Sequence, residues 1–216
     1  MPQIVLLRHG QASFGGADYD VLSDTGHRQV ALAKAALDER NIAPTVVVSG
    51  ELRRQLGTAA AWTDTPVVDP RWNEYVSNDV LHAHGFPDTS LDESVGTDSR
   101  RFQDVLDVAL TAWIAAGAAG PAVEPWSAFV GRVGGAFHEL VGSLGPGETA
   151  LVATSGGAIA AVAVAVLRLP HEHFLAFNRV TVNAAFTKIA IGRSGTSLVS
   201  FNEHAHLDQA NLVTYR

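Results

Sequence analysis

Two basic clusters near the N-terminus have side chains that suit phosphate chemistry. Arg8, His9 and Gly10 follow an apolar run at residues 4–7, and Arg54 follows a second apolar run. A planar guanidinium makes bidentate, charge-assisted hydrogen bonds to phosphate oxygens, and a neutral imidazole is a competent nucleophile toward phosphorus. The structural alternatives are a core histidine that pairs with a backbone carbonyl and arginines on a solvated helix face. The two apolar runs are expected to form strands of one sheet, and both are followed by arginine at the same edge of that sheet. This arrangement favours an anion site over the structural alternatives.

Glu74 is the candidate proton donor, because it lies in the aromatic segment between Trp72 and Tyr75. Burial among apolar side chains raises the pKa of a carboxyl group, and such a group can act as a general acid. Taken alone, Glu74 fits an ordinary loop position as well.

A layered α/β fold must position these residues. The alternation of strand and helix over the first third of the chain is typical of a three-layer α/β/α sandwich with a mostly parallel central sheet. The carboxyl ends of parallel strands share one edge, where ligands bind. The patterns predict strands at residues 4–7, 45–48, 67–68, 150–154, 184–191 and 198–201, and helices at 24–40, 52–62, 101–116, 127–143 and 158–167.

The length of 216 residues fits a single domain spanning residues 1–216. Residues 76–99 are polar and contain glycine and proline, so they predict irregular structure between the two strand-rich parts of the chain. We expect residues 76–145 to form a largely helical insertion over the active-site edge of the sheet.

Composition excludes several functions. The 22 acidic residues against 15 lysines and arginines give a net charge of −7, which disfavours general nucleic-acid binding. The absence of cysteine excludes disulfides, thiolate zinc sites and a thiol nucleophile. No segment has the pattern of a secretion signal or a membrane span, so a cytoplasmic location without a membrane partner is expected.

The order of these motifs resembles the histidine phosphatase superfamily, the phosphoglycerate-mutase-like fold. Leu7-Arg8-His9-Gly10 matches the signature in which the histidine is phosphorylated. Residues 49–59 resemble the Ser-x-x-Leu-x-Arg-x-x-x-Thr-Ala segment, which places the second phosphate-binding arginine at Arg54 rather than Arg53. Trp72-Asn73-Glu74 resembles the segment whose glutamate is the proton donor. The resemblance covers most of the chain.

One position departs from the family pattern. The family has Thr-His-Gly-Gly after the late strand, whereas this chain has serine at position 155 within residues 154–157. Ser155 can donate a hydrogen bond but supplies no positive charge, and the loss of one preorganised donor commonly costs about 10²–10³ in rate. We therefore expect low activity, unless another histidine fills the gap; the candidates are His82, His84 and His206.

The resemblance implies an acid-type phosphatase that works in two phosphoryl-transfer steps. His9 attacks phosphorus, Arg8 and Arg54 clamp the phosphoryl oxygens, and Glu74 protonates the leaving oxygen. Four further residues are expected to contact phosphate: Ser155, Gly156, Gln11 and Ser13. Two alternatives stay open, a mutase and a phosphate- or phosphoprotein-binding module. The short segment after the Arg-His-Gly signature favours the phosphatase over the mutase.

The expected partner is a small-molecule phosphomonoester, without a cofactor. The predicted insertion contains few basic residues, which argues against a highly phosphorylated substrate. No metal is expected, because the paired histidines at 171/173 and 204/206 lack the helical spacing of a metal-binding motif. The apolar C-terminal strands are compatible with a homodimer.

Overall fold

The computed structural model describes residues 1–13, 20–86 and 99–215. Within these residues six strands form one mixed sheet in the order β3-β2-β4-β1-β5-β6. The prediction of an α/β fold with a mostly parallel central sheet is confirmed, because β1 to β4 run parallel while β5 and β6 pair antiparallel. The strands are β1 (Gln3–Arg8), β2 (Val46–Ser49), β3 (Val67–Val68), β4 (Thr149–Thr154), β5 (Phe186–Gly192) and β6 (Gly195–Glu203).

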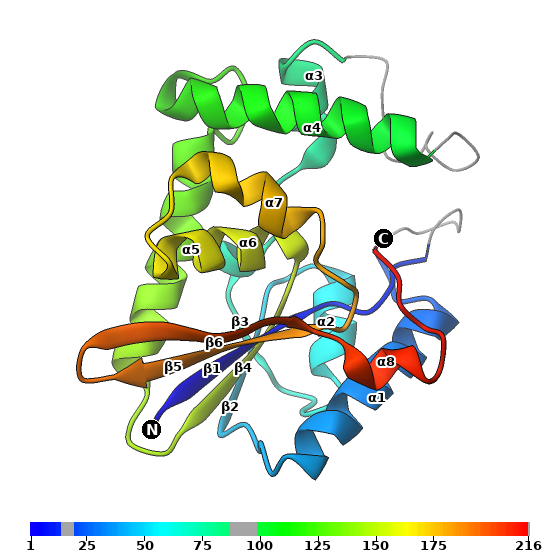
Figure 1. Ribbon diagram of the computed structural model, residues 1–216, viewed down its shortest axis with the longest axis vertical. Coiled ribbons are helices and arrows are strands. Elements are labelled where there is room, and N and C mark those ends of the chain that lie inside the picture. Colours follow the sequence, from blue (N-terminus) through cyan, green and yellow to red (C-terminus); the bar gives the residue numbers. More distant parts are fainter. Residues whose placement is uncertain (14–19, 87–98, 216) are drawn as a thin grey trace.

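The central strand β1 explains why helices cover both faces of the sheet. Its continuous apolar run points alternate side chains to opposite faces. Ile4 and Leu6 belong to a core cluster shared with the helices on one face, and Val5 and Leu7 belong to a second cluster under helix α1 (Asp24–Glu39) on the other. Figure 1 shows α1 and α2 (Arg53–Ala59) on the side opposite α5, α6 and α7.

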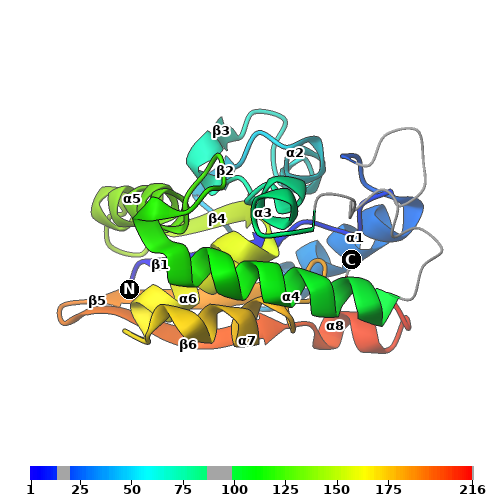
Figure 2. The ribbon, with the colours of Figure 1, turned by 90° about the horizontal axis from the view of Figure 1, so that it is seen from above.

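The helices on the larger-core side include three that the sequence predicts. The bounds are α4 (Ser99–Ala116), α5 (Trp126–Ser143) and α6 (Gly156–Val166). Figures 1 and 2 show α4 running next to α7 (Phe174–Asn178). By length and composition alone, the window Phe102–Ala119 could cross a membrane, but its buried members Phe102, Leu106, Leu110 and Trp113 pack in the protein core.

Three short helices were absent from the sequence prediction: α3 (Ser77–Ala83), α7 and α8 (Ala205–Asp208). Each has seven residues or fewer, so it is too short to be stable alone and depends on tertiary packing. In α3, for example, Val80 and Leu81 are buried in the core shared with α4. The prediction of irregular structure at residues 76–99 is therefore wrong for the α3 segment. Residues 87–98 of that stretch lie outside the described residues.

The described residues also contain short 3₁₀ helices: η1 (Pro70–Trp72), η3 (Gly117–Ala119) and η4 (His171–His173).

Candidate active site

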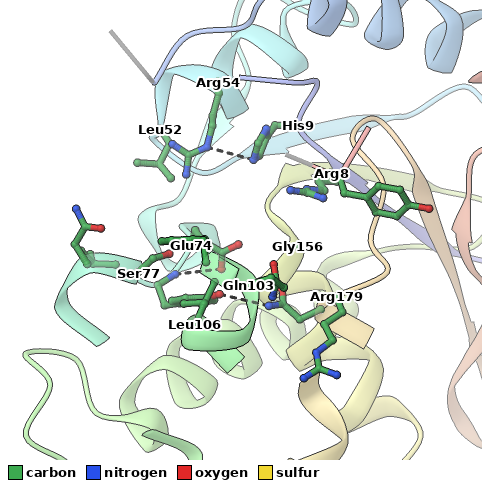
Figure 3. Close-up of a pocket in the computed structure, with 16 residues that line it drawn as sticks. Arg8, His9, Leu52, Arg54, Glu74, Ser77, Gln103, Leu106, Gly156 and Arg179 are labelled. Carbon is green, nitrogen blue, oxygen red and sulfur yellow. Dashed lines mark hydrogen bonds between the residues drawn. The ribbon is translucent and has the colours of Figure 1, made fainter. Parts of the chain in front are cut away.

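A pocket of about 330 Å³ lies at the carboxyl edge of the parallel strands. This volume falls at the lower end of the usual range for small-molecule sites. Figure 3 shows that the pocket brings together five of the eight predicted site residues: Arg8, His9, Arg54, Glu74 and Gly156. Arg8 ends β1, Arg54 lies in the first turn of α2, and Glu74 follows η1. The lining residues are Arg8, His9, Leu52, Arg54, Glu74, Tyr75, Val76, Ser77, Asn78, Phe102, Gln103, Leu106, Gly156, Asn178, Arg179 and Tyr215.

The hydrogen bonds of His9 identify its tautomer. Nδ1 lies 2.8 Å from the carbonyl oxygen of Gly10, and a carbonyl only accepts, so Nδ1 carries the proton when the ring is neutral. Nε2 then holds the lone pair and accepts a hydrogen bond from Nε of Arg54 at 3.2 Å. Burial lowers the pKa of His9 well below its usual value, and the charges of Arg54 and Arg8 lower it further. The arrangement keeps His9 neutral, with its lone pair facing the pocket arginine.

Arg8 and Arg54, the two pocket arginines that the sequence predicts, are held in place by other groups. Arg54 pairs with Asp20, with 2.5 Å between Nη1 and Oδ1. The other Asp20 oxygen accepts from the backbone N–H of Arg53 at 2.9 Å, so Asp20 also binds the first turn of α2. Arg8 donates from Nη1 to the carbonyl oxygen of Thr181. Sequence analysis missed Asp20, because an acid 34 positions from its partner gives no local pattern.

Glu74 is partly buried, and both of its carboxyl oxygens accept backbone hydrogen bonds. Gly157 donates at 2.9 Å and Tyr75 donates at 3.2 Å. Burial raises the pKa of Glu74, although the Gly157 hydrogen bond and the charges of Arg54 and Arg8 oppose the rise. A carboxyl group with a raised pKa that lines the same pocket as a neutral imidazole can serve as a proton donor.

The structure places Ser155 outside the residues that line the pocket. Its side chain is buried, and its Oγ accepts a hydrogen bond from Nε2 of Gln55 at 2.8 Å. Gly156, the first residue of α6, does line the pocket. No described histidine other than His9 lines it: His82 and His84 lie at the C-terminal end of α3, and His206 stacks on Phe186.

Gln11 and Ser13 also lie outside the pocket lining. The side-chain oxygen of Gln11 accepts from Ser23 at 3.1 Å, and the backbone of Ser13 donates to Val21 at 2.8 Å. The predicted phosphate contacts of Gln11, Ser13 and Ser155 are therefore not supported by their positions, whereas Gly156 is placed to contact an anion. Among the described residues, no group of three or more histidines or acids is placed to hold a metal ion.

The outer part of the pocket contains residues that sequence analysis missed. Asn178 lies at the end of α7 and donates to the Tyr75 hydroxyl at 3.4 Å. Arg179 follows it and pairs with Asp107 of α4, with 2.5 Å between Nη2 and Oδ2. Tyr215, near the C-terminus, forms another part of the wall. None belongs to a recognisable motif, and the fold alone brings them to the pocket.

The chain is similar in sequence and fold to known proteins. The family model described as "Histidine phosphatase superfamily (branch 1)" matches residues 4–204. A structure titled "Mycobacterial hydrolase 2" is 25% identical over 97% of this chain and 94% of that chain, with a TM-score of 0.68. Mycobacterial glucosyl-3-phosphoglycerate phosphatase in complex with inorganic phosphate is 25% identical over 94% of this chain and 98% of that chain, with a TM-score of 0.66. Phosphoserine phosphatase of Entamoeba histolytica with 3-phosphoglyceric acid shares the fold, at 16% identity, 96% and 100% coverage and a TM-score of 0.67.

Proposed function

Because the chain belongs to branch 1 of the histidine phosphatase superfamily, we propose that it hydrolyses small phosphomonoesters through a phosphohistidine formed on His9. One observation carries the proposal: a neutral His9, with its lone pair at Nε2, shares a pocket with two arginines and a glutamate of raised pKa. A site that only bound an anion would need the arginines but not a carboxyl group of raised pKa as a proton donor. The relatives named above are described as hydrolases or phosphatases.

In the first step, Nε2 of His9 attacks phosphorus, and the bond from phosphorus to the leaving oxygen breaks. Glu74 donates its proton to that oxygen, so the alcohol leaves neutral. Arg8 and Arg54 bind the phosphoryl oxygens and stabilise the charge that they carry in the transition state. The Nε–H of Arg54 that faces Nε2 in the structure turns to a phosphoryl oxygen when the anion binds.

In the second step, water attacks phospho-His9 and the nitrogen–phosphorus bond breaks. The Glu74 carboxylate accepts a proton from the water, which restores both groups and releases inorganic phosphate. The short segment that follows the Arg8-His9-Gly10 signature favours hydrolysis over a mutase reaction.

The substrate proposed for this site is a small phosphomonoester whose leaving group carries a carboxylate. Arg179 supplies a third guanidinium on the pocket wall, and its side chain is half exposed there. The named relatives with glucosyl-3-phosphoglycerate and 3-phosphoglyceric acid in their titles point to the same class.

A low rate is proposed as well, because the Ser155 hydroxyl is bound to Gln55 and no second histidine lines the described pocket. Removing one preorganised donor from a site commonly lowers the rate about 10²–10³-fold.

The first test measures hydrolysis of an aryl phosphate by wild type and by His9→Ala. The second compares kcat/KM of the wild type for 3-phosphoglycerate, which carries a carboxylate, with kcat/KM for glycerol 3-phosphate, which does not. The expected result is turnover that His9→Ala abolishes, with a preference for 3-phosphoglycerate that Arg179→Gln removes. Equal background rates in wild type and His9→Ala, with tight phosphate binding in both, would overturn the phosphatase and favour the binding module. Turnover without the preference would overturn only the substrate class.

A further inference from the structure

The segment at residues 212–215 lies next to the loop that carries His9. Gln29 of α1 donates from Nε2 to the carbonyl oxygen of Leu212 and to Oγ1 of Thr214, each at 2.7 Å. The Thr214 hydroxyl in turn donates a hydrogen bond to Oδ1 of Asn183 at 2.9 Å. The backbone N–H of Asn183 donates a hydrogen bond to the carbonyl oxygen of Thr214 at 2.9 Å. The Thr214 hydroxyl therefore both accepts a hydrogen bond, from Gln29, and donates one, to Asn183.

The two partners of Thr214 hold the His9 loop at both of its ends. Asn183 donates from Nδ2 to the carbonyl oxygen of His9 at 3.2 Å. The Oε1 of Gln29 accepts the backbone N–H of Gln11 at 2.8 Å. Gln29 and Asn183 are fully buried, so water does not replace these bonds. Between the two anchors lies Gly10, which packs so closely on α1 that a Cβ there would lie 2.5 Å from the carbonyl oxygen of Gly26.

We propose that Thr214 is a positioning residue: it joins Gln29 and Asn183 into a clamp that fixes the backbone of residues 9–11 and so aims His9 into the pocket. The inference rests on the proposed function for its kinetic consequence, because it assumes that His9 is the reacting group. The chain of donors runs in one direction, from Gln29 through Thr214 and Asn183 to His9, and each bond polarises the next. Misplacing a reacting group by about 1 Å costs on the order of 10²-fold in rate.

The same anchor determines where Tyr215 lies. Tyr215 directly follows Thr214 in the chain and lines the pocket, although its own side chain is 55% exposed. The clamp thus connects one wall of the pocket to the backbone of His9.

The experiment compares Thr214→Val, which keeps the shape but loses the hydroxyl, with Thr214→Ser, which keeps the hydroxyl. Thr45→Val is the matched control. The Thr45 hydroxyl also makes two hydrogen bonds, to the carbonyl and N–H of Thr149 at 3.1 and 3.3 Å, at the opposite end of the sheet. Each variant is measured for thermal stability, for kcat and KM with an aryl phosphate, and for the titration of the His9 ring by NMR.

The expected result is a fall in kcat of about 10–100-fold for Thr214→Val with KM changed less than twofold, and recovery in Thr214→Ser. The His9 titration should move toward its ordinary value in Thr214→Val and stay low in the other variants. Thr45→Val should lose stability but keep wild-type kcat.

Wild-type kcat and His9 titration in Thr214→Val would overturn the clamp, as would a Thr214→Ser variant as impaired as Thr214→Val. The NMR titration does not depend on turnover. If wild type and His9→Ala are equally inactive, the proposed function fails, and the His9 titration still decides whether the clamp exists.

Discussion

The partners of His9 decide which ring nitrogen can react. Because the Gly10 carbonyl accepts a hydrogen bond from Nδ1–H, the lone pair is at Nε2, the atom that faces Arg54. Glu74 complements it, because burial favours the protonated carboxyl. At the scale of single residues, burial acts on two groups in the same pocket and favours the neutral form of both.

These two pKa shifts predict the pH dependence of the reaction. Activity needs His9 neutral and Glu74 protonated. The lowered pKa of His9 lets activity persist into acid, and kcat/KM falls only as pH drops below that pKa. The raised pKa of Glu74 moves the alkaline fall of kcat/KM upward from the pH at which an ordinary glutamate ionises. We expect an acid-side optimum in a plot of kcat/KM against pH for an alkyl phosphate.

Glu74→Gln tests the assignment of the alkaline limb. It should lower kcat for an alkyl phosphate by about 10²–10⁴-fold, and much less for an aryl phosphate, whose leaving group needs little protonation. The alkaline limb should disappear with the carboxyl group. An alkaline limb that persists unchanged in Glu74→Gln would assign it to another residue.

Ser155 and Gln55 act as a pair. The Gln55 side chain is fully buried and its amide lies 2.8 Å from the Ser155 hydroxyl, so an imidazole at position 155 meets an occupied site. Ser155→His alone should therefore lower stability without raising kcat. Gln55→Ala combined with Ser155→His should raise kcat for an aryl phosphate by about 10-fold or more, because a pocket donor is added. An equal gain from the single and double variants would show that the two positions are independent.

At the scale of elements, the start of helix α6 connects the strand β4 to the proton donor. The Gly157 N–H binds Glu74, and a Cβ at position 157 would lie 2.1 Å from Oε1 of Glu74 and 2.7 Å from the Tyr75 ring. Glycine is required there for close approach. Helix N-termini also offer N–H groups and a positive field to anions.

Gly157→Ala should lower kcat for an alkyl phosphate by about 10²-fold, because displacing the acid by about 1 Å removes its alignment. Gly135→Ala on α5 is the matched control, since a Cβ at position 135 meets nothing within 4 Å. That control should keep wild-type kcat and gain about 0.5–1 kcal/mol of stability, which thermal unfolding measures. Wild-type kinetics in Gly157→Ala would show that the close packing of Gly157 does not align Glu74 for proton donation.

The sequence predicts the long elements well for a physical reason. Continuous apolar runs next to glycine or proline mark buried strands, and β1 and β4 extend one or two residues beyond the predicted cores. Short helices such as α3 form because of packing with distant residues, so local patterns miss them.

For the site as well, residues in local motifs could be predicted, whereas residues placed by long-range contacts could not. Motif residues such as Arg8, His9, Arg54 and Glu74 could be predicted and meet in the pocket. Asp20 and Tyr215 could not, because long-range contacts place them.

At the scale of the whole molecule, residues from the central sheet and from the helical layers on both of its faces line the pocket. Arg8 comes from β1, Arg54 from α2 on one face, and Gly156 from α6 on the other. An anion that binds all three connects the two core clusters, so binding and folding stability are coupled.

Phosphate or vanadate should therefore stabilise the fold. At 100 times its Kd, such an anion adds about 2.7 kcal/mol, which raises Tm by roughly 5–10 °C for a chain of this size. Arg54→Met should abolish the rise. Arg53→Met, next in the chain but outside the pocket lining, should retain it. An equal rise in both variants, measured by thermal unfolding, would place the anion elsewhere.

The central claim is that the phosphoryl group is transferred to His9. The most direct measurement is a single turnover with excess enzyme and labelled aryl phosphate, quenched in alkali because phosphohistidine is labile in acid, followed by peptide mass spectrometry. We predict one phosphoryl group on the peptide that contains His9, formed and lost at rates consistent with turnover, and none in His9→Ala. Turnover that continues in His9→Ala, or that proceeds in wild type with the label on another residue, would contradict the account.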